Sequence, residues 1–253
     1  MVPDVSDSRP HSSLDIHDVA DVTHAGGMRA TRAFPTGTHA HFDPFVLFER
    51  FHVAADQGFP SHAHAGFEIL TYMLEGGMAH DDSLGHDVTT RAGEAMRITA
   101  GDGIRHSEFP ADGPCSGLQL WVNLPRDRKG IEPSYADASS DELPTETGDG
   151  VSITTVVGEG APLDLETPMQ YRDVTLSAGA SWTWNRPEDW VGFCYVVSGS
   201  GTVDGTALEV GQFCTVDADG ASVTLSTEDR CRVVVVDGVP HDEAIHQRGP
   251  IVA

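Results

Sequence analysis

Short runs of β-branched and aromatic residues, separated by turn-forming residues, constrain the fold of this chain more than any other feature. Helical periodicity is scarce, whereas runs rich in Val, Ile, Phe, Tyr and Thr recur between clusters of Gly, Pro and Asp. Runs of this length with turn signals between them are typical of all-β sandwiches and barrels. We therefore predict an all-β protein. The clearest predicted strands lie within 67–74, 117–122, 169–176, 192–198 and 230–236.

A weak internal repeat indicates two similar halves. Segments 72–77 and 91–96 are echoed by segments 195–200 and 208–213, and each pair is typical of a strand, a tight hairpin, a second strand and a Gly turn into a third. The repeat predicts two stacked β-barrels, with the stretch rich in Pro, Ser, Asp, Glu and Gly as a connector between them. The expected organisation is a loosely held N-terminal arm over 1–24, a first barrel over 25–128, the connector over 129–150 and a second barrel over 151–253.

The charge of the chain limits its partners. Among 253 residues there are 15 Lys+Arg against 39 Asp+Glu, which gives a formal net charge of -24. Such a charge repels the phosphate backbone, so we expect no direct binding to nucleic acid. The self-repulsion is screened at molar salt, which favours a salt-adapted prokaryotic cytosol as the setting. The alternative is an acidic protein from an ordinary cytosol.

Neither a membrane segment nor an export signal is expected. No apolar stretch approaches about 18 residues, and the first 22 residues are polar and acidic. We therefore expect a soluble, cytoplasmic protein that makes no contact with a membrane, and a monomer. The four cysteines form no Cys-x-x-Cys pair and lie in apolar, strand-like contexts, which predicts buried free thiols.

Two pairs of residues at i and i+2 in the first half predict a metal site. His62 and His64 form one pair, and on an extended strand both rings point to one face. His106 and Glu108 form the other. Three imidazoles and a carboxylate from two strands suit a first-row divalent ion such as iron, manganese, nickel, copper or zinc. Glu68 has the same strand parity as His64 and competes with Glu108 for the carboxylate position.

The remaining histidines are weaker candidates. His39 and His41 have the same spacing, but they lack a glycine-flanked frame and a second pair, so we expect no metal there. Positions at the rim of the site or in solvent are expected for the polar residues of the hairpin after Met78, namely His80, Asp81, Asp82 and His86.

The order of Gly, His-x-His, Glu, a Gly-Gly hairpin, a further Gly and a third His is the cupin double motif. Within that superfamily the chain resembles the pirins, a family with two cupin domains in one chain, from about residue 42 to residue 250. The resemblance rests on FDPF at 42–45, HAHAGFE at 62–68, AHDDSLG at 79–85, TAGDGIRHSE at 99–108 and GLQLWVNLP at 117–125.

The resemblance implies that iron(II) is bound by His62, His64, His106 and Glu108, with Glu68 off the metal; manganese, nickel, copper, cobalt and zinc are alternatives. It also implies a second cupin domain without metal ligands, which agrees with Asn-Arg-Pro at 185–187 where a His-x-His would stand. Three positions depart from the family pattern beside the metal and alter the charge there, namely Ala65, Asp102 and Arg105.

Two activities follow from the resemblance. As a quercetin 2,3-dioxygenase, the protein would bind the deprotonated 3-oxygen of a small aromatic flavonol on its metal. Glu108 would take the proton, and dioxygen would open the ring with loss of carbon monoxide. As a redox sensor, it would change a surface that a regulatory protein partner contacts when iron(II) becomes iron(III). We expect the oxygenase; the sensor is the alternative, and a structural metal is the third interpretation.

Overall fold

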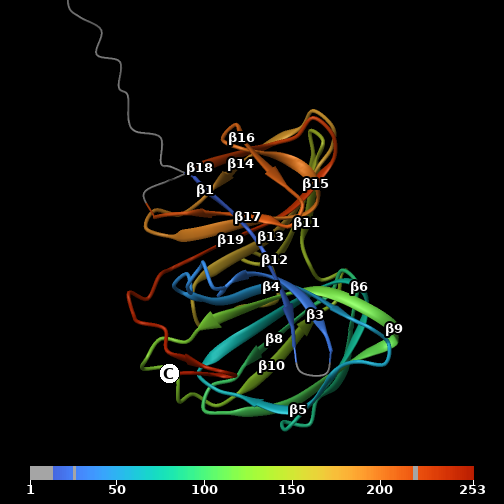
Figure 1. Ribbon diagram of the computed structural model, residues 1–253, viewed down its shortest axis with the longest axis vertical. Helices are drawn as coiled ribbons and strands as arrows, with labels where there is room; N and C mark the ends of the chain where they lie inside the picture. The colour runs from blue at the N-terminus through green and yellow to red at the C-terminus, as the bar shows by residue number, and fades with distance from the viewer. Residues whose placement is uncertain (1–13, 25–26, 219–221) are drawn as a thin grey trace, which may run out of the picture.

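The computed structural model describes residues 14–24, 27–218 and 222–253, and these form two all-β domains stacked along the long axis of the molecule (Figure 1). Every regular element in these ranges is a strand. The prediction of an all-β protein with two domains is therefore confirmed. Within the described residues the first and last strands of each large sheet do not pair with each other. Each predicted barrel is therefore an open sheet and not a closed barrel.

The N-terminal domain contains a nine-stranded sheet with the order β10-β8-β6-β9-β4-β3-β2, to which β5 adds by pairing with β9 and β7 by pairing with β6. Two long strands cross the whole domain, so each pairs with different neighbours along its length. The strands are β2 (Ala20–Thr23), β3 (Arg29–Phe34), β4 (Phe45–Val53), β5 (Phe59–His64), β6 (Phe67–Asp82), β7 (Asp87–Arg91), β8 (Ala95–Thr99), β9 (Ile104–Asn123) and β10 (Ser134–Ala138).

The C-terminal domain is built on a ten-stranded sheet whose central order is β1-β17-β15-β19-β13-β12-β11. A two-stranded ribbon, β20 (Gln247–Arg248) and β21 (Ile251–Val252), follows it. The strands of the sheet are β1 (Asp15–Asp18), β11 (Thr145–Gly148), β12 (Val151–Val157), β13 (Met169–Leu176), β14 (Ser181–Asn185), β15 (Val191–Val203), β16 (Thr206–Glu209), β17 (Gln212–Val216), β18 (Ser222–Ser226) and β19 (Cys231–Gly238).

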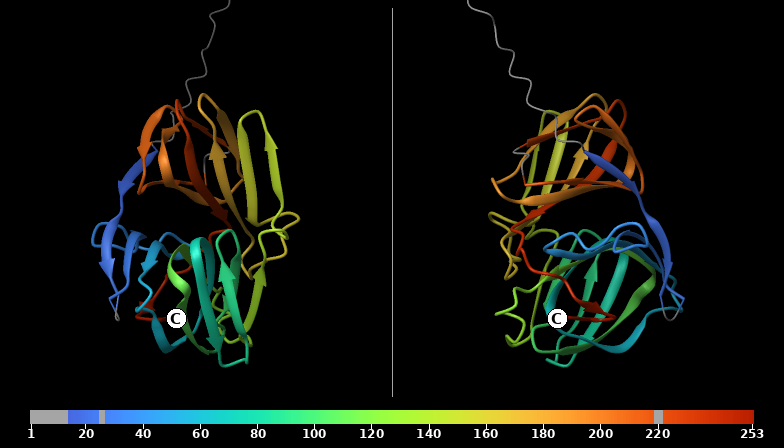
Figure 2. Two further views of the ribbon diagram at one scale, coloured as in Figure 1. Left: turned by 90° about the vertical axis from the view of Figure 1, so that its right-hand side faces the viewer. Right: turned by 60° about the vertical axis from the view of Figure 1, so that its left-hand side comes forward.

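Both ends of the described chain cross to the other domain. Strand β1, from the region expected to be a loose arm, pairs with β17 of the C-terminal sheet, and β2 then joins the N-terminal sheet (Figure 2). At the other end, β21 returns to the N-terminal domain, where Ile251 pairs in parallel with Ala65. The expected connector is likewise structured, because β10 pairs with the first sheet and β11 with the second.

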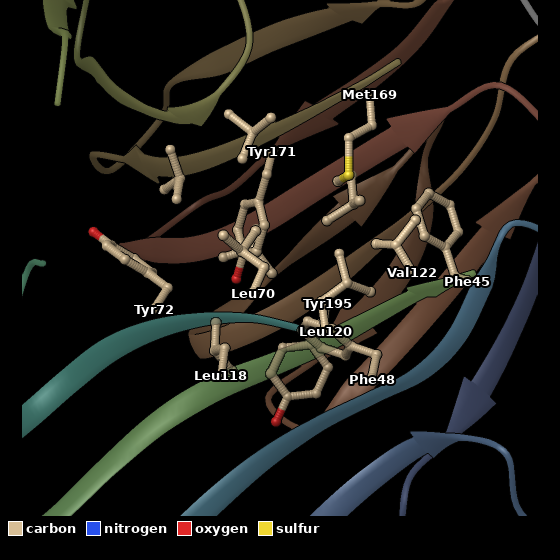
Figure 3. Packing of buried hydrophobic residues seen from close by; sticks show 14 of the residues in the cluster. Phe45, Phe48, Leu70, Tyr72, Leu118, Leu120, Val122, Met169, Tyr171 and Tyr195 are labelled. Atoms are coloured by element: carbon tan, nitrogen blue, oxygen red, sulfur yellow. The ribbon is translucent and has the colours of Figure 1, made fainter. Parts of the chain in front are cut away.

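The two domains share one hydrophobic core. Strands of both sheets contribute buried side chains to it, as the close view shows (Figure 3). Phe48 packs edge-on against Phe193 and Tyr195, with ring centroids 4.8 Å and 5.3 Å apart. Such aromatic contacts bury large areas and fix the relative orientation of the sheets. The domains are therefore packed as one body rather than strung on a linker.

Two further expectations can be compared with the fold. All four cysteines are buried and free, as predicted. Among the described residues, no helix is long and apolar enough to cross a membrane.

Candidate metal centre

Strand register brings the predicted histidines together. β5 and β9 are antiparallel, and His62 lies directly opposite His106 in their ladder. His64 follows two residues later on β5, so its ring points to the same face as that of His62. The side-chain nitrogens of His62, His64 and His106 lie within 4.8 Å of one another, a group that could hold a metal ion. The i, i+2 spacing had predicted this convergence.

The inner nitrogens face each other at short range. Nε2 of His62 is 2.9 Å from Nε2 of His106. The outer nitrogens contact backbone carbonyls: Nδ1 of His62 is 3.0 Å from the oxygen of Pro60, and Nδ1 of His64 is 3.3 Å from that of Pro250. A carbonyl oxygen only accepts, so each Nδ1 carries the proton and each Nε2 keeps its lone pair. Metal-ligating histidines are oriented in this way.

Burial keeps two of these imidazoles neutral. His64 and His106 are almost completely buried. Burial, and then the neighbouring imidazoles, lower the pKa of each to about 3. Near neutral pH both rings therefore offer lone pairs to a cation instead of protons.

Glu108 is placed to complete the donor set. Its side chain is buried, and within the described residues its Oε1 has no hydrogen-bond partner. A carboxylate oxygen in that situation is costly unless a cation or proton meets it. Glu108 belongs to a second group, with His106 and His80, whose ligand atoms also lie within 4.8 Å of one another. The four predicted ligands are thus spread over two overlapping groups that share His106.

His80 and Asp82 were expected at the rim, and that expectation is wrong. His80 is 1% exposed and Asp82 is 8% exposed. On β6 they lie opposite Glu108 and His106 of β9. Nδ1 of His80 is 3.4 Å from Nδ1 of His106, and its Nε2 is 3.2 Å from the Asp82 carboxylate. The i, i+2 spacing of His80 and Asp82 was the sequence signal that could have placed them on the inner face.

The other two hairpin residues do lie outside. Asp81 is exposed, and the side chain of His86 is 39% exposed while its Nδ1 contacts Asp82 at 3.0 Å. Asp102 and Arg105, which depart from the family pattern, are exposed as well. Their charges therefore act on the site only from its surroundings.

Glu68, the competing carboxylate, is engaged elsewhere. Its Oε1 accepts a hydrogen bond from the Thr99 hydroxyl at 2.7 Å, and its Oε2 accepts one from the backbone N–H of Glu166 at 2.9 Å. Burial raises the pKa of Glu68 to about 7. Through Oε2 the side chain links the N-terminal sheet to the other domain, and both oxygens already accept a hydrogen bond. Of the two candidates, Glu108 alone has a buried oxygen without a hydrogen-bond partner in the part of the chain that the structure describes.

The weaker histidine pair lies in a different place. His39 packs against His17 of β1, with ring centroids 4.2 Å apart, and Nδ1 of His41 contacts the carbonyl of Val46 at 2.8 Å. Among residues 14–24, 27–218 and 222–253, both groups with three potential metal-binding side chains lie in the N-terminal domain.

A cavity of about 420 Å³ opens beside the histidines. His62, His64 and Glu108 line one part of it. Trp121 and Phe59 contribute aromatic walls, and the ring of Trp121 meets that of His64 edge-on at 5.3 Å. The volume falls in the range of small-molecule pockets. Further lining residues, which sequence reasoning missed, are His24, Arg32, Leu47, Glu49, Gln119, Gln247, Gly249 and Pro250.

Comparison with known proteins identifies the family. The family model described as Pirin matches residues 27–122, and the Pirin C-terminal cupin domain matches residues 171–253. Pirin-1 of Arabidopsis thaliana is 38% identical over 221 residues, which cover 83% of this chain and 77% of that protein. The chain belongs to the pirin family. The predicted resemblance is therefore confirmed.

Two solved structures share the fold. A crystal structure of quercetin 2,3-dioxygenase from Acinetobacter baumannii has a TM-score of 0.87 at 25% identity, covering 94% of this pirin and 90% of that chain. The bacterial pirin YhhW from Escherichia coli, solved in complex with nickel(II), has a TM-score of 0.74 at 22% identity over 90% and 99% of the two chains. The second likeness concerns the fold alone.

Proposed function

We propose that this pirin is a metal-dependent oxygenase of the quercetin 2,3-dioxygenase type, with His62, His64, His106 and Glu108 as the metal ligands. The observation that carries the proposal is the convergence of imidazole nitrogens beside a buried carboxylate oxygen on the wall of an aromatic pocket, an oxygen that has no hydrogen-bond partner among the described residues. Iron(II) is the proposed ion, with manganese, nickel, copper, cobalt and zinc as alternatives. The likeness to the Acinetobacter baumannii dioxygenase supports the activity.

The donor set fits a first-row divalent ion. Imidazole nitrogen and carboxylate oxygen are the ligands such ions take in oxygenases. Four protein donors leave open positions when the ion has five or six ligands. An ion held there supplies Lewis acidity, which lowers the pKa of a coordinated hydroxyl.

The chain's own residues then have separate tasks. Trp121 and Phe59 bind the planar rings of a flavonol and exclude water from the pocket. Glu108 accepts the proton of the flavonol 3-hydroxyl through the carboxylate oxygen that does not bind the metal. The carbonyls of Pro60 and Pro250 hold the imidazoles in the tautomer that keeps each Nε2 free.

Oxygen uptake tests the proposal. Iron-loaded protein should consume dioxygen with a flavonol and bleach the near-ultraviolet band of the flavonol. Glu108→Ala should lose the activity, and His39→Ala, outside the pocket, should keep it. No turnover with a flavonol panel under iron, manganese, nickel, copper and cobalt loading would refute the oxygenase and favour the sensor.

One observation favours the sensor as the second candidate. Contacts run from His106 to His80, from His80 to Asp82 and from Asp82 to His86, which reaches the surface. A change in the charge of a metal at His106 would be transmitted along these contacts to a surface that a protein partner could contact. Different affinities of one partner for the iron(II) and iron(III) forms would support this function.

A further inference from the structure

A polar cluster lines the pocket and is not used by the proposed metal site. Glu49 of β4 is 2% exposed, and its two carboxylate oxygens have different partners. Oε1 lies 2.9 Å from Nε2 of His24, and Oε2 accepts a hydrogen bond from Nε of Arg32 at 2.8 Å. Burial raises the pKa of Glu49, but the hydrogen bond from His24 and the charge of Arg32 outweigh it and lower the pKa overall. The carboxylate is therefore ionised.

Strand register places this cluster on the pocket wall. Arg32 is paired with Glu49 across β3 and β4, and Glu49 is paired with Gln119 across β4 and β9. Side chains of directly paired residues project from the same face of a sheet. Arg32, Glu49 and Gln119 therefore form a polar row. Leu47 and Trp121, paired with each other two residues further along, form an apolar row beside it.

Two atoms of the cluster remain available to a ligand. Nε2 of His24 donates to the ionised Glu49, so in the neutral ring Nδ1 keeps a lone pair. Oε1 of Gln119 accepts a hydrogen bond from Nε1 of Trp121 at 3.0 Å, which leaves the amide nitrogen with both hydrogens. Neither Nδ1 of His24 nor Nε2 of Gln119 has a hydrogen-bond partner in the described part of the chain. The pocket thus offers one acceptor and one donor.

Two aromatic rings connect the cluster to the metal-binding histidines. The centroid of the Phe59 ring is 5.8 Å from that of His24 and 5.7 Å from that of His62. Trp121 bonds to Gln119 and contacts His64. Each aromatic side chain therefore touches a histidine of the metal site and a member of the polar cluster. A planar ligand of two or three rings that lies along them can reach both.

We infer that His24 and Gln119, the former held by Glu49 and Arg32, form a recognition site for a hydroxyl group of a planar aromatic ligand on a ring remote from the metal. The inference rests on the proposed function and narrows its substrate class. The preferred flavonols carry a further hydroxyl beyond the one that binds the metal. That hydroxyl donates to Nδ1 of His24 and accepts from Nε2 of Gln119.

Ligand pairs test this inference without turnover. Quercetin and 3-hydroxyflavone share the 3-hydroxy-4-keto edge, but 3-hydroxyflavone lacks the other hydroxyls. Their dissociation constants would be measured anaerobically by titration calorimetry on iron-loaded protein. We expect unaltered protein to bind quercetin roughly 100-fold more tightly, the factor for two hydrogen bonds of about 1.4 kcal/mol each. His24→Phe and Gln119→Leu should each remove one of these bonds and reduce the preference to about tenfold while metal content stays unchanged.

Controls separate the possible outcomes. His24→Phe leaves the Glu49–Arg32 ion pair intact, and His52→Phe on β4, outside this pocket, should keep the preference. The ratio of the two dissociation constants is compared between variants, because the different hydration of the two ligands is the same in every variant and cancels. An unchanged preference in both His24→Phe and Gln119→Leu, or equal binding of the two flavonols by unaltered protein, would overturn the inference and leave the proposed function standing. Binding of neither flavonol would overturn the proposed function as well.

Discussion

His62 and His106 face each other across β5 and β9, with their Nε2 atoms 2.9 Å apart. Two neutral imidazoles gain little from such proximity unless a proton or a cation lies between them. Because Nδ1 of His62 donates to a carbonyl, its Nε2 carries a lone pair that a metal ion can use. This relationship leads to the first prediction.

We expect His62→Ala, His64→Ala, His106→Ala and Glu108→Ala each to remove most of the bound metal. Elemental analysis of purified variants measures this directly. Glu68→Gln should retain the metal, because both oxygens of Glu68 already accept hydrogen bonds. Full retention of metal in any two of the first four variants would contradict the assignment.

Substitution of Asp82 tests whether His80 binds the metal itself or only orients His106. If His80 only orients His106, Asp82→Asn should weaken metal binding about 10- to 100-fold, the usual effect of losing an outer hydrogen-bond partner. His80→Phe should have an effect of similar size. Competition with a chelator of known affinity gives both values. A loss of metal in His80→Phe as complete as in His106→Ala would instead identify His80 as a ligand.

The close approach of the C-terminal ribbon depends on Gly66. At its φ of 84°, a Cβ would lie 1.8 Å from the carbonyl oxygen of Val252. Gly66→Ala should destabilise the fold by roughly 1–3 kcal/mol and detach residues 250–252, which support His64. Gly85→Ala is the matched control, because its φ is 96° and no atom lies within 4 Å of the added Cβ. Urea unfolding should show the larger loss in Gly66→Ala; equal losses would mean that backbone strain alone is responsible.

Stability should depend on pH through Glu68. Its pKa rises from an ordinary value of 4.5 to about 7 in the folded protein, so the folded state holds this proton more tightly than the unfolded state. The stabilising contribution of Glu68 to the free energy of unfolding is therefore fully present below about pH 4.5 and is lost as the pH rises to about 7. The free energy of unfolding of Glu68→Gln, relative to that of unaltered protein, should therefore rise by on the order of 3 kcal/mol between pH 4.5 and pH 7. Urea unfolding at several pH values measures the difference, and a constant difference would contradict the prediction.

Salt should stabilise the fold. With 15 Lys+Arg against 39 Asp+Glu, surface carboxylates repel one another most strongly in the compact state. Screening relieves this repulsion, so the melting temperature should rise from about 0.1 M to 1 M and 3 M potassium chloride. A flat or falling melting temperature would show that the acidity is no adaptation to salt.

The sequence by itself determined the strands and the pairing of the site residues along each strand. A strand turns successive side chains to opposite faces, so His62 with His64, and His106 with Glu108, had to share a face once the segments were extended. Runs such as 117–122 and 230–236 are short, apolar and bounded by turn-forming residues, which is typical of buried strands of a sheet. The absence of a His-x-His at 185–187 likewise marked the second domain as different.

Tertiary structure decided which residues of neighbouring strands lie opposite each other. Register sets His62 opposite His106 and His80 opposite Glu108, and it depends on turns and packing along the whole of β9. It also brought Glu49 to the pocket beside Arg32, although nothing in the local pattern separates Glu49 from a surface residue. The pairing of β1 with the far domain and the return of Ile251 to Ala65 are contacts over more than 180 positions. Local propensity carries no information on such contacts, because they form only when two completed sheets present complementary edges and a shared core to each other.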